Sequence, residues 1–114
     1  MKLKQLIVVI SLALAAPVSA SSQTGGYVVG FGAIPGNIVL VGMTGSRTSP
    51  PGCSNPALPN RWALDLNSAM GQVYLSLLMS AQSLHQPVDV YGTGTCSVLG
   101  DGETIATIIT NHIQ

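Results

Sequence analysis

Two hydrophobic segments with strand composition lie between residues 27 and 43. Residues 27–34 and 38–43 flank the turn signal Pro35-Gly36-Asn37, so together they predict a hairpin. Gly30 and Gly32 lie two residues apart in the first segment. Glycines at this spacing leave one face of a strand open to close approach by a neighbouring chain or ring.

The strand pattern returns on both sides of a long central segment. Residues 61–66 alternate with period two, which predicts a half-buried strand. Its apolar side carries Trp62, Leu64 and Leu66. Residues 88–91 and the Thr- and Ile-rich residues 103–113 have strand composition and are separated by the tight turn signal at residues 100–102.

The central segment, residues 68–85, predicts one amphipathic helix. Its apolar residues recur at spacings of one and three and form one stripe. They are Met70, Val73, Tyr74, Leu77, Leu78, Ala81 and Leu84. Asn67 or Ser68 is the expected N-cap. Pro87 ends the helix, because the residue before a proline avoids helical geometry.

Leu75 and Met79 project from the opposite side of this helix, among polar residues. Two interpretations stay open. They are scattered surface hydrophobes, or they form a second, weakly apolar face that packs against another subunit. On the second interpretation they are candidate contacts of a homo-oligomer.

The order of elements predicts an α+β domain that is mainly β. Two strands, an irregular loop, one strand, one helix and two or three further strands make up the domain. Such a set packs as a small OB-like barrel, or as a curled antiparallel sheet, with one helix against it.

The first twenty residues predict a secretory signal peptide. Two lysines at the start precede an apolar run from Leu6 to Ala16, and Pro17-Val18-Ser19-Ala20 provides a small-residue exit for cleavage after Ala20. The run has 11 residues, whereas a membrane-spanning helix needs about 20. We therefore expect a secreted or periplasmic protein with no membrane span after cleavage. Residues 21–26 are expected to be a flexible lead-in to a single domain, 27–114.

Cleavage leaves a chain with very few charges. Both lysines lie before residue 20, so two arginines face four carboxylates, a net charge of −2 with the histidines neutral. A chain with no basic patch does not gather phosphates, which disfavours nucleic-acid partners. The absence of lysine also disfavours adsorption to anionic lipid.

Cys53 and Cys96 are the two cysteines of the chain and predict a disulfide in an oxidising compartment. The bond would close a loop of 42 residues, which chain-entropy arithmetic relates to roughly 4 kcal/mol of stabilisation. It would also pin the loop 44–60, which contains four prolines. A metal pair is the alternative, but His85 and His112 lie at no recognised ligand spacing, so no metal or cofactor is predicted.

Other polar motifs have ordinary structural explanations. Residues 92–95, Gly-Thr-Gly-Thr, lack the following helix and the lysine of a phosphate-binding loop. Asp101 and Glu103 lie two apart in a turn, and this spacing does not place two carboxylates across a substrate. No catalytic residue is therefore assigned, and a non-enzymatic protein is expected.

Arg61 and Trp62 are the candidate ligand-binding residues. Trp62 is the one tryptophan of the chain, and it is either a core residue or a stacking platform for a sugar. Arg61 faces the other side of the strand, where it could hold Asp65 or the carboxylate of a ligand.

Two resemblances add to this interpretation. The string from Arg61-Trp62-Ala63-Leu64-Asp65 through Gly92-Thr93-Gly94-Thr95-Cys96 to Gly100-Asp101-Gly102-Glu103-Thr104 resembles a group of small uncharacterised exported bacterial proteins. The helix and the following Gln86-Pro87-Val88-Asp89-Val90-Tyr91 are similar to the corresponding stretch of the subtilase cytotoxin B subunit and its pertussis-like relatives.

The toxin resemblance implies an OB-type barrel in a ring whose helices face a central channel, with glycans bound on the outside. Leu75 and Met79 would then be ring contacts. The cysteine spacing differs from that family, and no glycan-contacting residue transfers position by position. The resulting expectation is an exported non-enzymatic binding domain for a glycan or protein partner. The alternative is a stand-alone structural or inhibitor-like protein that binds through loop 44–60.

Overall fold

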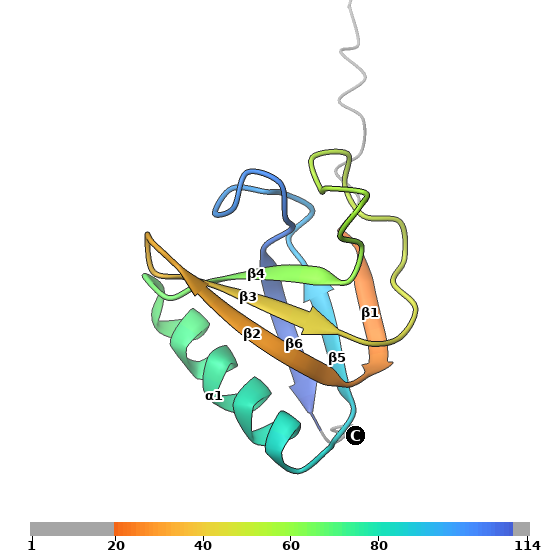
Figure 1. Cartoon of the computed structure of the whole chain (residues 1–114), viewed down its shortest axis with the longest axis vertical. Helices are drawn as coiled ribbons and strands as arrows, with labels where there is room; N and C mark the ends of the chain where they lie inside the picture. Colours follow the sequence, from red (N-terminus) through yellow and green to blue (C-terminus); the bar gives the residue numbers. More distant parts are fainter. Residues whose placement is uncertain (1–19, 111–114) are drawn as a thin grey trace, which may run out of the picture.

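The computed structural model describes residues 20–110 (Figure 1). Within them lie six strands and one helix: β1 (Ser22–Gly26), β2 (Val28–Ile34), β3 (Ile38–Met43), β4 (Arg61–Asp65), α1 (Ala69–Ser83), β5 (Val88–Gly92) and β6 (Ile105–Thr110). Residues 1–19 of the predicted signal peptide, the last part of the strand expected over 103–113, and His112 lie outside the described residues.

The strands form two three-stranded antiparallel sheets, ordered β1-β5-β6 and β2-β3-β4. One sheet crosses over the other in Figure 1. A parallel bridge between Ala63 of β4 and Thr104 brings the two sheets together at one edge. The mainly β, α+β class with one helix is therefore confirmed. No closed barrel is found within residues 20–110, because the hydrogen-bonded ladders end at three strands each.

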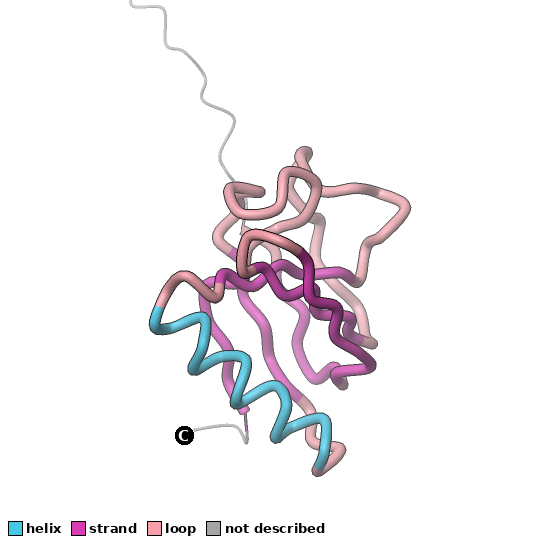
Figure 2. The backbone as a smooth tube through the Cα atoms, turned by 60° about the vertical axis from the view of Figure 1, so that its left-hand side comes forward, coloured by secondary structure: helices cyan, strands magenta, loops and turns pink. Residues whose placement is uncertain are grey.

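The core lies between the sheets and under the helix. It contains valines of β3 and β5, Trp62 and Leu64 of β4, and Leu78 and Ala81 of α1. Helix α1 contacts β4 and β2 of one sheet and β6 of the other, so it covers one open side between them (Figure 2).

The helix has the predicted position, and its cap is one of the two expected residues, but its buried face differs from the prediction. Ser68 is the N-cap, and its Oγ accepts a hydrogen bond from the Gly71 amide at 2.9 Å. The buried helix residues are Gly71, Leu78 and Ala81, and Tyr74 and Leu75 pack partly against the core. Four residues of the predicted stripe are instead exposed: Met70, Val73, Leu77 and Leu84.

Gly71 accounts for this difference between the predicted and the observed buried face of the helix. A Cβ atom built on it would lie 1.7 Å from the carbonyl oxygen of Asp65. A helix can approach the end of β4 this closely only through a residue without a side chain. Hydrophobic periodicity alone does not register such a contact, and the stripe that it predicted was wrong at four positions.

The expected flexible lead-in 21–26 is also corrected, since most of it is strand β1. Ser22 pairs with Tyr91 and Gln23 with Val90 of β5. Its sequence, Ser-Gln-Thr-Gly-Gly, has no hydrophobic alternation. The strand is held by this pairing with a distant segment and by burial of its glutamine, neither of which a local pattern contains.

Candidate functional site

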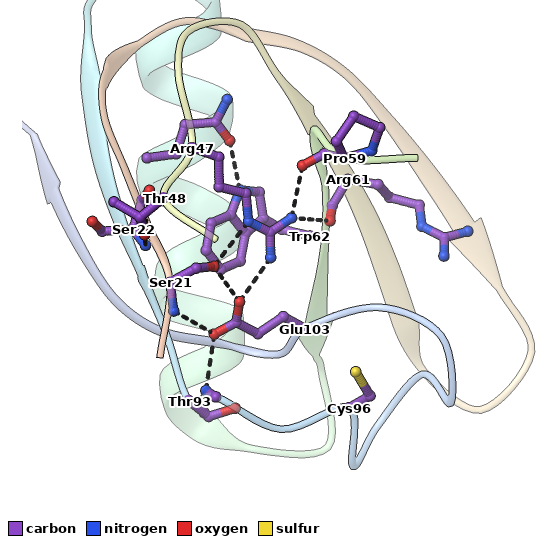
Figure 3. Close-up of polar contacts among 12 residues, drawn as sticks. Ser21, Ser22, Arg47, Thr48, Pro59, Arg61, Trp62, Thr93, Cys96 and Glu103 are labelled. Carbon is purple, nitrogen blue, oxygen red and sulfur yellow. Dashed lines mark hydrogen bonds and ion pairs between the residues drawn. The ribbon is translucent and has the colours of Figure 1, made fainter. Parts of the chain in front are cut away.

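Arg47 and Glu103 form an ion pair in the interior, between the loop after β3 and the turn before β6 (Figure 3). Arg47 Nη2 lies 2.8 Å from Glu103 Oε1, and the side chains are 3% and 0% exposed. Removing two charges from water is costly unless their remaining hydrogen-bonding groups are also satisfied. The surroundings of both residues meet this requirement.

Both carboxylate oxygens of Glu103 accept hydrogen bonds from neighbouring segments. Oε1 also accepts from the Ser21 hydroxyl. Oε2 accepts from the backbone amides of Ser21 at 3.1 Å and Gly94 at 2.9 Å. Within the motif over residues 92–95, the Gly94 amide therefore binds a carboxylate of the chain itself. A Cβ on Gly92 would lie 1.9 Å from Glu103 Oε2, so the glycine is required for this packing.

Each nitrogen of the Arg47 guanidinium donates at least one hydrogen bond. Its guanidinium carbon lies 3.7 Å from the ring centroid of Trp62, a cation–π geometry. Nε donates to the Ser21 hydroxyl at 2.9 Å, and Nη1 donates to the carbonyls of Pro59 at 2.9 Å and Arg61 at 3.1 Å.

Trp62 is fully buried, so its ring offers no face to a sugar at the surface. Its Nε1 donates to Gln23 Oε1 at 2.8 Å. The Gln23 amide in turn donates to the Thr44 and Gly45 carbonyls at 3.0 and 3.1 Å and to Asn60 Oδ1 at 3.3 Å. Of the two alternatives for Trp62, the structure favours the core residue.

Arg61, the second candidate ligand-binding residue, lies at the surface and is already paired. Its Nη2 lies 2.8 Å from Asp101 Oδ1 and also donates to the Asp101 carbonyl at 3.0 Å. The hydrogen bond from the Arg61 side chain holds the pKa of Asp101 below its usual value. The expected partner Asp65 instead accepts from the Asn67 amide at 2.9 Å.

An open groove of about 700 Å³ borders this cluster. Val29 of β2 is 62% exposed and Leu58 of the proline-rich loop is 43% exposed, and both line the groove. The other lining residues are Gly42, Met43, Thr44, Gly45, Ala57, Pro59, Asn60 and Arg61. The lining contains no aromatic ring, and Arg61, its one ionisable residue, is paired with Asp101.

The buried cluster holds the groove in place. Arg47 binds the carbonyls of Pro59 and Arg61, and Gln23 binds Thr44, Gly45 and Asn60. Five of the ten lining residues are therefore fixed from inside. Groups fixed by packing and second-layer hydrogen bonds form a preorganised surface.

Cys53 and Cys96 form the predicted disulfide, with their Cα atoms 6.1 Å apart. The bond pins the loop 44–60, whose residues 57–60 form one wall of the groove. A disulfide is consistent with an oxidising location outside the cytoplasm.

The two candidate oligomer contacts differ in exposure. Leu75 packs partly against the core, whereas Met79 is exposed.

The sequence interpretation missed Ser21, Gln23 and Arg47, which complete the buried cluster. No local sequence pattern marks these three residues, because their partners lie far away in the sequence.

Two classes of site are absent from the part of the chain that the structure describes. No cluster of three or more His, Cys, Asp or Glu side chains there could hold a metal ion. No helix in residues 20–110 has the length and apolar content needed to span a membrane. Comparisons with protein-family models, curated proteins and solved structures found no match to this chain.

Proposed function

We propose that this protein is exported, is cleaved after Ala20 and acts as a non-enzymatic binding domain whose recognition surface is the groove between Val29 and Leu58. The observation that carries the proposal is the preorganised groove itself, which is open, largely apolar and held from inside by Arg47 and Gln23. A surface that is already fixed loses little conformational entropy when a partner binds.

The charged side chains support binding over acid–base catalysis. Arg47 pairs with Glu103 and Arg61 with Asp101. Asp65 accepts from a turn amide and Asp89 accepts from the Gly25 amide at 2.7 Å. These six side chains are engaged within the fold, and the groove lining holds no carboxylate.

The groove fits an extended, uncharged, apolar segment of a protein partner. Its aliphatic lining residues, together with Gly42, suit aliphatic side chains, and its paired Arg61 needs no counter-charge from the ligand. A sugar site would commonly offer an exposed aromatic face, which this groove lacks. Glycan recognition, the function implied by the toxin resemblance, is thus the second outcome of the test.

Peptide selection from a displayed random library, together with a glycan array, tests this function on the disulfide-bonded protein. We expect the selected peptides to be rich in aliphatic residues and their affinity to fall at least about tenfold in Leu58→Asp, since a buried carboxylate is costly. Met79→Asp is the matched control on exposed helix surface and should retain binding. If the protein binds glycans and Leu58→Asp loses that binding, the ligand of the groove is a sugar and not a peptide. If neither peptides nor glycans bind, the groove is excluded as a recognition site.

A further inference from the structure

Ser21 occupies an unusual position for a residue that follows a predicted cleavage site. It is buried, with 1% of its surface exposed, while Ala20 directly before it is exposed. Its backbone nitrogen lies 3.1 Å from Glu103 Oε2, and its hydroxyl contacts the other oxygen of the same carboxylate. Its carbonyl accepts from the Gly92 amide at 2.9 Å, which fixes the residue on β5.

Cleavage after Ala20 changes the chemistry of this nitrogen. In the uncleaved chain it is a neutral amide that donates one hydrogen bond. In the cleaved chain it is a primary amine, which carries a positive charge at neutral pH. The exposed position of Ala20 means that the residues before Ser21 can leave without disturbing the buried side of the contact.

We propose that the Glu103 carboxylate is a binding site for the chain's own new N-terminus, so that cleavage after Ala20 creates a second cation on this carboxylate and stabilises the mature domain. This proposal rests on the processing step of the proposed function, but not on the groove or its ligand. The reaction is amide hydrolysis: water supplies a hydroxyl to the Ala20 carbonyl and a proton to the Ser21 nitrogen.

The geometry accommodates both cations. Arg47 Nη2 approaches Oε1 and the Ser21 nitrogen approaches Oε2, so they occupy different oxygens of one carboxylate. The Ser21 hydroxyl also contacts Oε1 and accepts from Arg47 Nε at 2.9 Å. The amide contact already has an ionised acceptor. The ammonium adds a full positive charge on the donor, so the attraction between two opposite charges is added to the hydrogen bond and the ammonium contact should exceed the amide contact that it replaces.

The composition of the chain makes a clean test available. Lysine occurs at positions 2 and 4 and nowhere else, so a chain that begins at Ser21 has one primary amine, its α-amino group. Acetylation in urea with the disulfide intact, followed by refolding, therefore restores a neutral amide at this one atom. The matched control is a chain that begins at Ala20, whose amine lies one residue outward. Both chains are released from the same fusion partner.

Urea unfolding of the four samples decides the proposal. We expect acetylation to raise the unfolding equilibrium constant about tenfold in the Ser21 chain and less than about twofold in the Ala20 chain. Equal effects in both chains, no effect in either, or stabilisation by acetylation would overturn it. The intact mass of the protein recovered from the exporting cell tests processing separately, because a first residue other than Ser21 refutes cleavage after Ala20 and leaves the groove untouched.

Discussion

Two arginine–carboxylate pairs join the same two segments of the molecule, and they do so in opposite surroundings. Arg47–Glu103 and Arg61–Asp101 both connect the region 44–61 to the loop before β6, each with an N–O distance of 2.8 Å. The first pair is 3% and 0% exposed, and the second is 19% and 52% exposed. The same contact distance thus occurs once in the core and once at the surface, where the carboxylate is half exposed.

The difference lies in what surrounds each pair. The Glu103 carboxylate has donors from two other segments, Ser21 and Gly94, whereas the Asp101 carboxylate has one further side-chain donor, Asn55 Nδ2 at 3.5 Å. A buried pair with such a shell fixes one arrangement of the chain and leaves an uncompensated charge if either partner is lost. An exposed pair contributes little, because water solvates each partner alone. The Cys53–Cys96 disulfide is a third link between the same segments.

Glu103→Gln should be the most damaging change. It keeps the shape of the side chain but leaves Arg47 buried without a counter-charge, so we expect a loss of about 3 to 5 kcal/mol in the free energy of unfolding. Urea unfolding followed by tryptophan fluorescence measures this directly, since Trp62 stacks on Arg47. A loss no larger than that of Asp101→Asn would show that burial does not distinguish the pairs.

Removal of the disulfide tests whether the buried pair can join the two segments alone. Native disulfides usually contribute 2 to 4 kcal/mol, and a long loop lies toward the upper end, so Cys53→Ser with Cys96→Ser should cost roughly that amount. We expect the near-ultraviolet circular dichroism of Trp62 to persist below the unfolding transition. Loss of that signal without urea would mean that the covalent link, and not the ion pair, sets the arrangement.

Gly92→Ala perturbs the buried pair without changing any charge. The new Cβ would meet Glu103 Oε2 at 1.9 Å and the Trp62 ring at 2.8 Å, and overpacking of this kind costs roughly 1 to 3 kcal/mol. Gly30→Ala is the matched control on an open strand face, since nothing lies within 4 Å of its Cβ. Thermal unfolding of both variants should separate them, and equal midpoints would contradict tight packing at Glu103.

The contrast between the pairs also marks where sequence reasoning succeeds. Strand β3 was predictable, and the N-cap was predictable to within the two residues Asn67 and Ser68, because hydrophobic runs, turn residues and capping residues act locally. The disulfide was predictable from a single pair of cysteines. Each of these features is contained in a few neighbouring residues or in a count.

The buried cluster was not predictable, because its members come from four distant segments. Gln23 and Trp62 are 39 residues apart, and Ser21 and Glu103 are 82 apart. Nothing near Arg47 distinguishes it from a surface residue of the loop. The same limit applies to Gly71, whose contact with Asp65 sets the buried face of the helix. The groove depends on both the loop 44–60 and the buried cluster, so its position could not be inferred from the sequence.

Asp101→Asn should have the smallest effect, and its pH dependence completes the comparison. The hydrogen bond from Arg61 lowers the pKa of Asp101 in the folded state. A carboxyl with a lowered folded pKa contributes stability above its unfolded pKa of about 4, and loses it as the pH falls through the lower folded value. At pH 7 we expect little change in the urea midpoint, because the pair is exposed.

Between about pH 5 and pH 2 the parent protein should lose stability relative to Asp101→Asn, so their midpoints should converge. A variant that stays equally displaced from the parent across this range would show that the Asp101 side chain acts through its turn, not through its charge.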